Sequence, residues 1–483
     1  MAELAFRTAT ELAASLRSGE LSSAELTEYY IERIERLDGD VNAVVVRDFD
    51  RARDAAVRAD EARARDESLG PLHGVPMTIK EAYDIEGLPT TWGDPRFRDN
   101  QATSDAESVR RFKAAGAHFL GKTNVPLHLA DFQSYNDIYG TTNNPWDLTR
   151  GPGGSSGGSA ASLAAGFAAL EAGSDIGGSI RNPAHYCGIY GHKPTWGIVP
   201  SQGHALPGDI TSPDIAVVGP MARSAEDLAL ALDIVAGADP MHAAGWRLEL
   251  PRPRDMKLAD LRIAVWADDP RAPVSTEVAA RAEEVGRTLA GLGATVSFDA
   301  RPDVDLDHSL ETYHALLTAV MAAEITDEVK ARRRIEAADL EPSDRGLRAD
   351  SIRFSGIEHG TWLKMNNRRT RIRQQWRAFF ESWDVLICPV TATPAIKHDH
   401  SRLRGRLLEV NGEQQQYFRQ IFWAGQIGVA SLPSTVFPTG PSAGGLPIGL
   451  QAVGAEFNDY TTIEFTRLLA KEIGGFVPPP GFG

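Results

Sequence analysis

The sequence has few cysteines, no excess of positive charge and no long apolar run, and each absence excludes a class of protein. Its two cysteines, Cys187 and Cys388, are too few for a disulfide framework and are typical of a reducing compartment. The net charge of −15 disfavours a broad phosphate-binding surface, so no nucleic acid is expected as a direct partner. No stretch has the length of a transmembrane helix, and residues 1–20 lack the apolar run of a signal peptide. We therefore expect a cytoplasmic protein with a small-molecule partner and no membrane contact.

The first part of the chain, residues 1–66, has the apolar spacing of helices. Ser22 and Glu25 have the spacing of a capping box, in which two side chains satisfy the free amides at a helix start. Ser104 and Glu107 have the same spacing and predict a second helix start. We expect residues 1–66 to pack as a helical segment on the rest of the chain.

Residues 67–483 alternate between short apolar runs and helical patterns. One apolar run, bounded by Pro and Gly, ends at Lys80, and residues 117–120 form the next one after the helix expected from Ser104. This order is typical of an α/β protein, so we predict a mixed β-sheet core sandwiched between helices on both faces, within one catalytic domain. Residues 300–382 are mostly helical, and we expect this insertion to determine specificity.

The most unusual stretch runs from Gly151 to Pro183 and reads GPGGSSGGSAASLAAGFAALEAGSDIGGSIRNP. Gly/Ser-rich composition is typical of flexible linkers. A linker would not contain the small apolar residues that separate the two Gly/Ser clusters, nor end in the charged and rigid run Ser179–Pro183. We therefore interpret residues 151–183 as a buried functional loop region.

Two short motifs suggest other chemistries. Residues 116–123 match the P-loop pattern G-x-x-x-x-G-K-[ST], but a helix instead of a strand is expected before them, so we reject a nucleotide site. Residues 153–157 match G-x-S-x-G, the nucleophile elbow of α/β-hydrolases, which would make Ser155 the nucleophile of an esterase. The residues before this motif are predicted to be a loop, so the esterase is our second choice. We interpret Cys187 as a small buried residue, and the 12 histidines lack metal-ligand spacing, so we expect no metal and no cofactor.

Lys80, Ser155 and Ser179 form a third pattern, together with the runs VPMTIKE, FLGKTNVP, GGSSGGSAA and GSDIGGSIRNPAHYCGIYGHKPT. From about Gly70 to Val199 the sequence resembles the amidase signature family of serine hydrolases. The resemblance implies that Ser179 is the nucleophile, that Ser155 is a bridging serine in a cis peptide bond, and that Lys80 is the base. The chemistry is coherent, because a serine hydroxyl needs a neighbouring base and burial lowers the pKa of a lysine toward neutrality.

The loop before Ser179 is expected to bind the carbonyl oxygen of a substrate through backbone N–H groups, since glycines let the backbone approach a ligand closely. The predicted donors of this oxyanion hole are the amides of Ile176, Gly177, Gly178 and Ser179. The predicted supporting residues are Ser156, Asp175 and Arg181, and the candidate pocket walls are Phe132, Gln133 and Tyr135.

Together these residues predict a serine amidohydrolase that cleaves linear, non-peptide carboxamides through an acyl-enzyme on Ser179. Anilides, carbamates (urethanes) and esters are further candidate substrates, because they present the same carbonyl geometry. One alternative, within the family, is the glutaminase subunit of a tRNA-dependent amidotransferase. Another is a non-catalytic binding protein of the same fold, against which the intact set of Lys80, Ser155 and Ser179 argues. We expect a monomer or a homodimer.

Overall fold

The computed structural model describes residues 4–483 except 68, 212, 324 and 342. The α-helices within the described residues are α1 (Ala9–Ser18), α2 (Ser23–Val41), α3 (Phe49–Ala64), α4 (Glu107–Ala114), α5 (Gly157–Ala164), α6 (Arg181–Cys187), α7 (Ala225–Val235), α8 (Thr276–Gly291), α9 (Leu306–Met321), α10 (Asp327–Ala338), α11 (Leu347–Phe354), α12 (His359–Ser382), α13 (Ile421–Val429) and α14 (Asp459–Ile473). The strands are β1 (Val44–Arg47), β2 (Pro76–Lys80), β3 (His118–Thr123), β4 (Tyr135–Asn136), β5 (Gly140–Thr141), β6 (Glu171–Asp175), β7 (Tyr190–Lys193), β8 (Val217–Ala222), β9 (Arg262–Val265), β10 (Thr295–Ser297), β11 (Val385–Pro389), β12 (Leu407–Val410), β13 (Glu413–Gln416), β14 (Ser434–Pro441) and β15 (Pro447–Val453).

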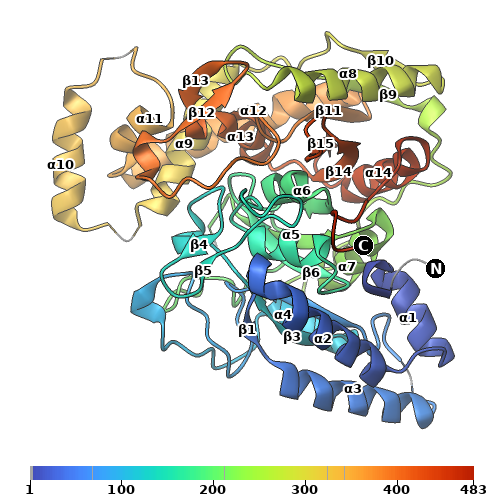
Figure 1. The fold of residues 1–483 in the computed structure, drawn as a ribbon. Helices are drawn as coiled ribbons and strands as arrows, with labels where there is room; N and C mark the ends of the chain where they lie inside the picture. Colours follow the sequence, from blue (N-terminus) through green and yellow to red (C-terminus); the bar gives the residue numbers. More distant parts are fainter. Residues whose placement is uncertain (1–3, 68, 212, 324, 342) are drawn as a thin grey trace.

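An eight-stranded mixed sheet with the order β10-β9-β11-β15-β14-β7-β8-β6 forms the centre of the molecule (Figure 1). The β10, β9 and β11 strands are parallel to one another, and every further neighbour in the sheet pairs antiparallel. A second, three-stranded sheet has the order β1-β3-β2. The predicted α/β class with a mixed sheet is therefore confirmed.

Helices cover both faces of the large sheet, and the alternation along β9 and β11 shows why. Successive residues of a strand point to opposite faces, so an apolar strand buried on both sides serves two cores. The residues that share a core with α7, α8 and α14 are Ile263, Val265, Val385 and Ile387. The residues that share the opposite core with α9, α12 and α13 are Ala264, Leu386 and Cys388.

One of the two predicted capping boxes is present. The hydroxyl oxygen of Ser22 accepts a hydrogen bond from the amide of Glu25 at the start of α2, and the carboxylate of Glu25 accepts one from the amide of Ser22. The prediction at Ser104 is wrong, because α4 begins at Glu107 and has no side-chain cap. The carboxylate of Glu107 instead accepts hydrogen bonds from Arg110 and Arg111, three and four residues further along α4.

The stretch from Gly151 to Pro183 is buried at every residue except the half-buried Ile176, so it is not a linker. It is also more regular than a loop region, because it contains α5 and β6. Sequence patterns missed four strands of the large sheet, β6, β7, β8 and β14, in which glycines, prolines or histidines are typical of turns. These strands are almost entirely buried in the sheet, where pairing and packing outweigh local preference.

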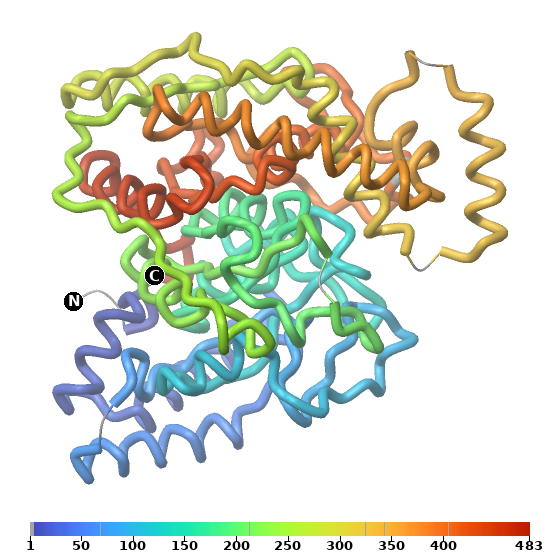
Figure 2. The backbone as a smooth tube through the Cα atoms, turned by 180° about the vertical axis from the view of Figure 1, so that it is seen from behind, coloured from blue at the N-terminus to red at the C-terminus, as the bar shows by residue number. Residues whose placement is uncertain are grey.

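The helical insertion lies at one end of the molecule. Figures 1 and 2 show α10 as its most outlying helix, with α9, α11 and α12 between α10 and the large sheet. None of the helices in the described part of the chain is both long and apolar enough to cross a membrane.

Candidate active site

Lys80 is the last residue of β2, and its side chain is fully buried. Its Nζ lies 2.6 Å from Oγ of Ser155, 2.9 Å from Oγ of Ser174 and 3.0 Å from Oγ of Ser156. Ser155 and Ser156 belong to the turn before α5, and Ser174 belongs to β6. The fold therefore gathers one lysine and three serine hydroxyls from three separate segments.

Burial lowers the pKa of Lys80 to about 7, because the charged ammonium loses its hydration. The carboxylates of Asp175 and Glu171 act in the opposite direction and limit the decrease. An amine with a pKa of about 7 is often neutral at physiological pH and can then accept a proton.

Ser155 follows a cis peptide bond, which joins it to Gly154. The chain is too crowded here for other residues: a Cβ at Gly154 would lie 2.4 Å from a backbone carbonyl oxygen, and one at Gly158 would lie 2.3 Å from a backbone nitrogen. The hydroxyl of Ser155 bonds to Lys80 and to no described histidine. The described residues directly before it form no strand, so the turn differs from a nucleophile elbow.

Ser179 lies in the loop between β6 and α6, on the wall of a cavity. The amide of Ser156 donates a 3.1 Å hydrogen bond to the carbonyl oxygen of Ser179 and so joins the two serine-bearing segments. Within the described structure no hydrogen bond joins Oγ of Ser155 to Oγ of Ser179. Ser179 thus lines the cavity, while the hydroxyl of Ser155 accepts a hydrogen bond from Lys80.

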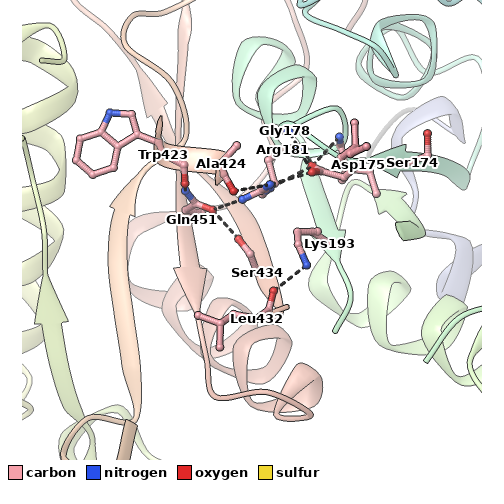
Figure 3. A network of polar contacts seen from close by, with 12 residues as sticks. Ser174, Asp175, Gly178, Arg181, Lys193, Trp423, Ala424, Leu432, Ser434 and Gln451 are labelled. Carbon is pink, nitrogen blue, oxygen red and sulfur yellow. Dashed lines mark hydrogen bonds and ion pairs between the residues drawn. The ribbon is translucent and has the colours of Figure 1, made fainter. Parts of the chain in front are cut away.

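The buried pair of Asp175 and Arg181 shapes this loop (Figure 3). The Asp175 carboxylate accepts two hydrogen bonds from the guanidinium, at 2.8 and 3.0 Å, and one from the amide of Gly178 at 2.9 Å. Burial alone would raise the pKa of Asp175, but the charge and hydrogen bonds of Arg181, the charge of Lys193 and a hydrogen bond from the amide of Ile180 lower it to about 2. Arg181 also donates to Gln451 and to the carbonyl oxygen of Ala424, which ties the loop to β15 and α13.

The four amides predicted to form an oxyanion hole differ in whether they already donate a hydrogen bond within the described structure. The amide of Gly178 donates to Asp175, as described above. The amides of Ile176, Gly177 and Ser179 donate to no described residue. Three of the four N–H groups are therefore available to a ligand beside Ser179.

A cavity of about 1010 Å³ opens from Ser179 toward the helical insertion. Of the three predicted pocket residues, Phe132 lines this cavity. Gln133 instead hydrogen-bonds to the backbone of Asp399, and the hydroxyl of Tyr135 accepts a hydrogen bond from Arg406. Apolar side chains from the site and from the insertion line much of the remaining wall: Ile176, Leu310, Leu317, Met321, Leu347, Ile352, Phe418 and Ile421.

Sequence reasoning missed two residues that the structure places at the site. Ser174 is a single serine in a short strand and has no motif of its own, although it directly precedes Asp175. Tyr313 belongs to α9, within the helical insertion, and its hydroxyl donates to the carbonyl oxygen of Ile176 at 3.0 Å. Only the folded chain shows that either residue contacts the site.

The sequence model of a family described as Amidase matches residues 25–463. A protein of Moorella thermoacetica, named as a subunit of Glutamyl-tRNA(Gln) amidotransferase, is 35% identical over 481 residues, which cover 96% of each chain. The solved structure of 6-aminohexanoate cyclic dimer hydrolase complexed with substrate superimposes with a TM-score of 0.80 and 27% identity over 99% of both chains. A Glutamyl-tRNA(Gln) amidotransferase subunit from Thermotoga maritima superimposes with a TM-score of 0.77 and 25% identity, covering 99% of this chain and 98% of that one.

Proposed function

Because this chain belongs to the amidase family, we propose that it is a serine hydrolase that cleaves carboxamide C–N bonds through an acyl-enzyme on Ser179. The observation that carries the proposal is the buried Lys80, whose Nζ lies 2.6 Å from Oγ of Ser155 and whose pKa is about 7. A surface lysine would be charged and could not act as a base.

In the first step, neutral Lys80 takes the proton of the Ser155 hydroxyl while Ser155 takes that of Ser179. The Oγ of Ser179 attacks the substrate carbonyl carbon, and the carbonyl oxygen becomes an oxyanion. Ser156 and Ser174 hold Nζ in place, so its lone pair stays directed at Ser155. The short Lys80–Ser155 distance supports this relay, and the Ser155–Ser179 contact is expected to close when substrate is bound.

The oxyanion is stabilised by the amides of Ile176, Gly177 and Ser179, which donate to no described residue. The amide of Gly178 has a different task in this proposal, since its bond to Asp175 fixes the shape of the loop. Losing one oxyanion donor typically costs about 3–4 kcal/mol of transition-state stabilisation.

In the second step, the protonated Lys80 returns its proton through Ser155 to the leaving amine as the C–N bond breaks. Water then attacks the acyl-enzyme, with the same residues removing its proton and restoring the hydroxyl of Ser179. Esters and carbamates present the same carbonyl geometry, and an alkoxide leaving group needs less protonation than an amine.

The cavity supports a substrate larger and more apolar than glutamine. Its volume of about 1010 Å³ is at the upper end of small-molecule sites, and α9 and α11 of the insertion contribute to its apolar wall. We therefore assign the insertion a role in substrate selection, with anilides, aryl carbamates and bulky aliphatic amides as the favoured class.

A second candidate is the glutaminase subunit of a tRNA-dependent amidotransferase, which the names of the relatives favour. In that case the enzyme would deliver ammonia from glutamine to partner subunits. Turnover of a panel of acetamide, anilides, aryl carbamates and glutamine by the purified chain separates the two. Turnover of anilides without a partner supports the amidase. Glutamine as the only substrate, with co-purifying subunits, overturns it in favour of the amidotransferase.

A further inference from the structure

Tyr313 connects the helical insertion to the loop that carries Ser179. The side chain comes from α9 and is fully buried, and its hydroxyl donates a 3.0 Å hydrogen bond to the carbonyl oxygen of Ile176. Ile176 lies three residues before Ser179 and directly follows β6, so it is the first residue of the proposed oxyanion loop. The contact therefore joins the helical insertion to the group of amides that would stabilise a reacting oxyanion.

The carbonyl of Ile176 and the amide of Gly177 belong to the same peptide unit, which is trans. In a trans peptide the C=O and the N–H point in opposite directions. A hydroxyl that holds this carbonyl toward α9 consequently directs the N–H of Gly177 away from α9. That N–H donates to no described residue.

We propose that Tyr313 is a positioning residue that fixes the Ile176–Gly177 peptide so that the N–H of Gly177 donates to the substrate oxyanion. This inference rests on the proposed function, because it requires an oxyanion to form beside Ser179. It assigns α9 a role in the rate of the chemical step, in addition to its place in the cavity wall.

The packing around Tyr313 leaves its ring little freedom. A Cβ at Gly425 of α13 would lie 2.7 Å from the ring, and a Cβ at Gly177 would lie 3.1 Å from the hydroxyl oxygen. Both glycines therefore allow the close approach of Tyr313 to the loop. Burial also raises the pKa of Tyr313, so the hydroxyl keeps its proton and remains a donor.

A second set of hydrogen bonds also holds the loop. Arg181 donates to Asp175 and to the carbonyl oxygen of Ala424 in α13, the helix that also packs on Tyr313 (Figure 3). The loop is thus fixed both by a buried ion pair and by the tyrosine hydroxyl. Removing the hydroxyl should free the Ile176–Gly177 peptide without breaking the ion pair.

The test compares Tyr313→Phe with Ser309→Ala. Ser309 lies on the same helix and donates a 2.6 Å hydrogen bond to Gln426 of α13, so its loss weakens the same helix packing without contacting the loop. We expect Tyr313→Phe to lower kcat for an anilide by about tenfold or more with KM changed less than about twofold, because misaligned transition-state donors cost rate and not ground-state binding. Ser309→Ala should keep kcat within about twofold of the wild-type value, although its change in Tm should be similar to that of Tyr313→Phe.

A second readout uses trifluoroacetophenone, which serine attacks to give a hemiketal oxyanion. Its inhibition constant should rise in Tyr313→Phe by the factor by which kcat/KM falls. If Tyr313→Phe and Ser309→Ala behave alike in kcat and in inhibition, the positioning role is wrong. Ser179→Ala, assayed in parallel, separates failure of the positioning role from failure of the proposed function. If Ser179→Ala retains activity, the proposed function itself is wrong.

Discussion

The Nζ of Lys80 lies 2.6 Å from the Oγ of Ser155, although 75 positions separate the two residues in the sequence. The contact exists because β2 ends next to the turn that precedes α5, and because burial keeps water away from the amine. Burial also makes the amine a usable base, since it lowers the pKa of Lys80 to about 7. Position and protonation state thus follow from the same packing.

Replacing the buried amine should abolish amide hydrolysis. We expect Lys80→Met to lower kcat/KM for an anilide by more than about a thousandfold, because both proton transfers depend on this base. Lys122→Met is the matched control: Lys122 is also fully buried, at the adjacent strand β3, and donates to Pro89 and Thr90 instead of the serines. The folded control should retain most of its activity by steady-state kinetics; a comparable loss in both variants would contradict the role of Lys80.

The pH profile of kcat/KM should have an acid limb near pH 7. The neutral amine is the active form, so kcat/KM should rise as the pH increases through the pKa of Lys80, about 7, and be lost below it. A pH profile between about 5 and 9 measures this limb. A profile without an acid limb near 7 would show that a different group controls the reaction.

Glu171→Gln should move that limb to lower pH. The Glu171 carboxylate raises the pKa of Lys80, and glutamine removes this charge while keeping an oxygen that can accept from Thr123. The same profile on this variant measures the shift. Burial raises the pKa of Glu171 itself to about 7, so its charge acts on Lys80 mainly in the upper part of the limb. A limb that moves to higher pH would contradict the assignment of the limb to Lys80.

The Asp175–Arg181 pair should contribute strongly to stability. Asp175→Asn leaves Arg181 buried without its counter-charge, and breaking a buried pair in this way typically costs about 3–5 kcal/mol. Asp384→Asn, in the partly exposed pair with Arg262, should cost about 0–1 kcal/mol in the free energy of unfolding. Urea unfolding measures both. Equal losses would mean that the buried network does not hold the loop.

Filling the cavity should discriminate by substrate size. Leu317 lines the cavity from α9, and Leu317→Trp would occupy part of its volume. We expect KM for a bulky anilide to rise by about tenfold, while kcat/KM for acetamide changes by less than about threefold. Parallel losses on the two substrates would indicate damage to the reacting centre, and would remove the basis for assigning the insertion to substrate selection.

Several elements could be predicted because their patterns are local. The capping box of Ser22 and Glu25 and the apolar strand ending at Lys80 agree with the structure. Strands such as β7, with the sequence YGHK, could not be predicted, because sheet pairing stabilises them against their own turn preference.

Within the site, paired serines and glycine clusters can be recognised in the chain, whereas single residues cannot. Ser174 contacts Lys80 only because β6 folds beside β2, and Tyr313 reaches the loop only because α9 packs on α13. Neither contact is marked by a local sequence pattern, since each depends on segments that are far apart in the sequence. Such contacts have to be read from the folded chain.

The central claim is that Ser179, and not Ser155, forms the covalent intermediate, and covalent labelling tests it most directly. The protein is treated with a fluorophosphonate, and the modified residue is identified by intact mass and peptide mapping. The account predicts one phosphonyl group per chain, on Ser179, with no labelling of Ser179→Ala and much slower labelling of Lys80→Met. Labelling on Ser155, or unchanged labelling of Ser179→Ala, would contradict it.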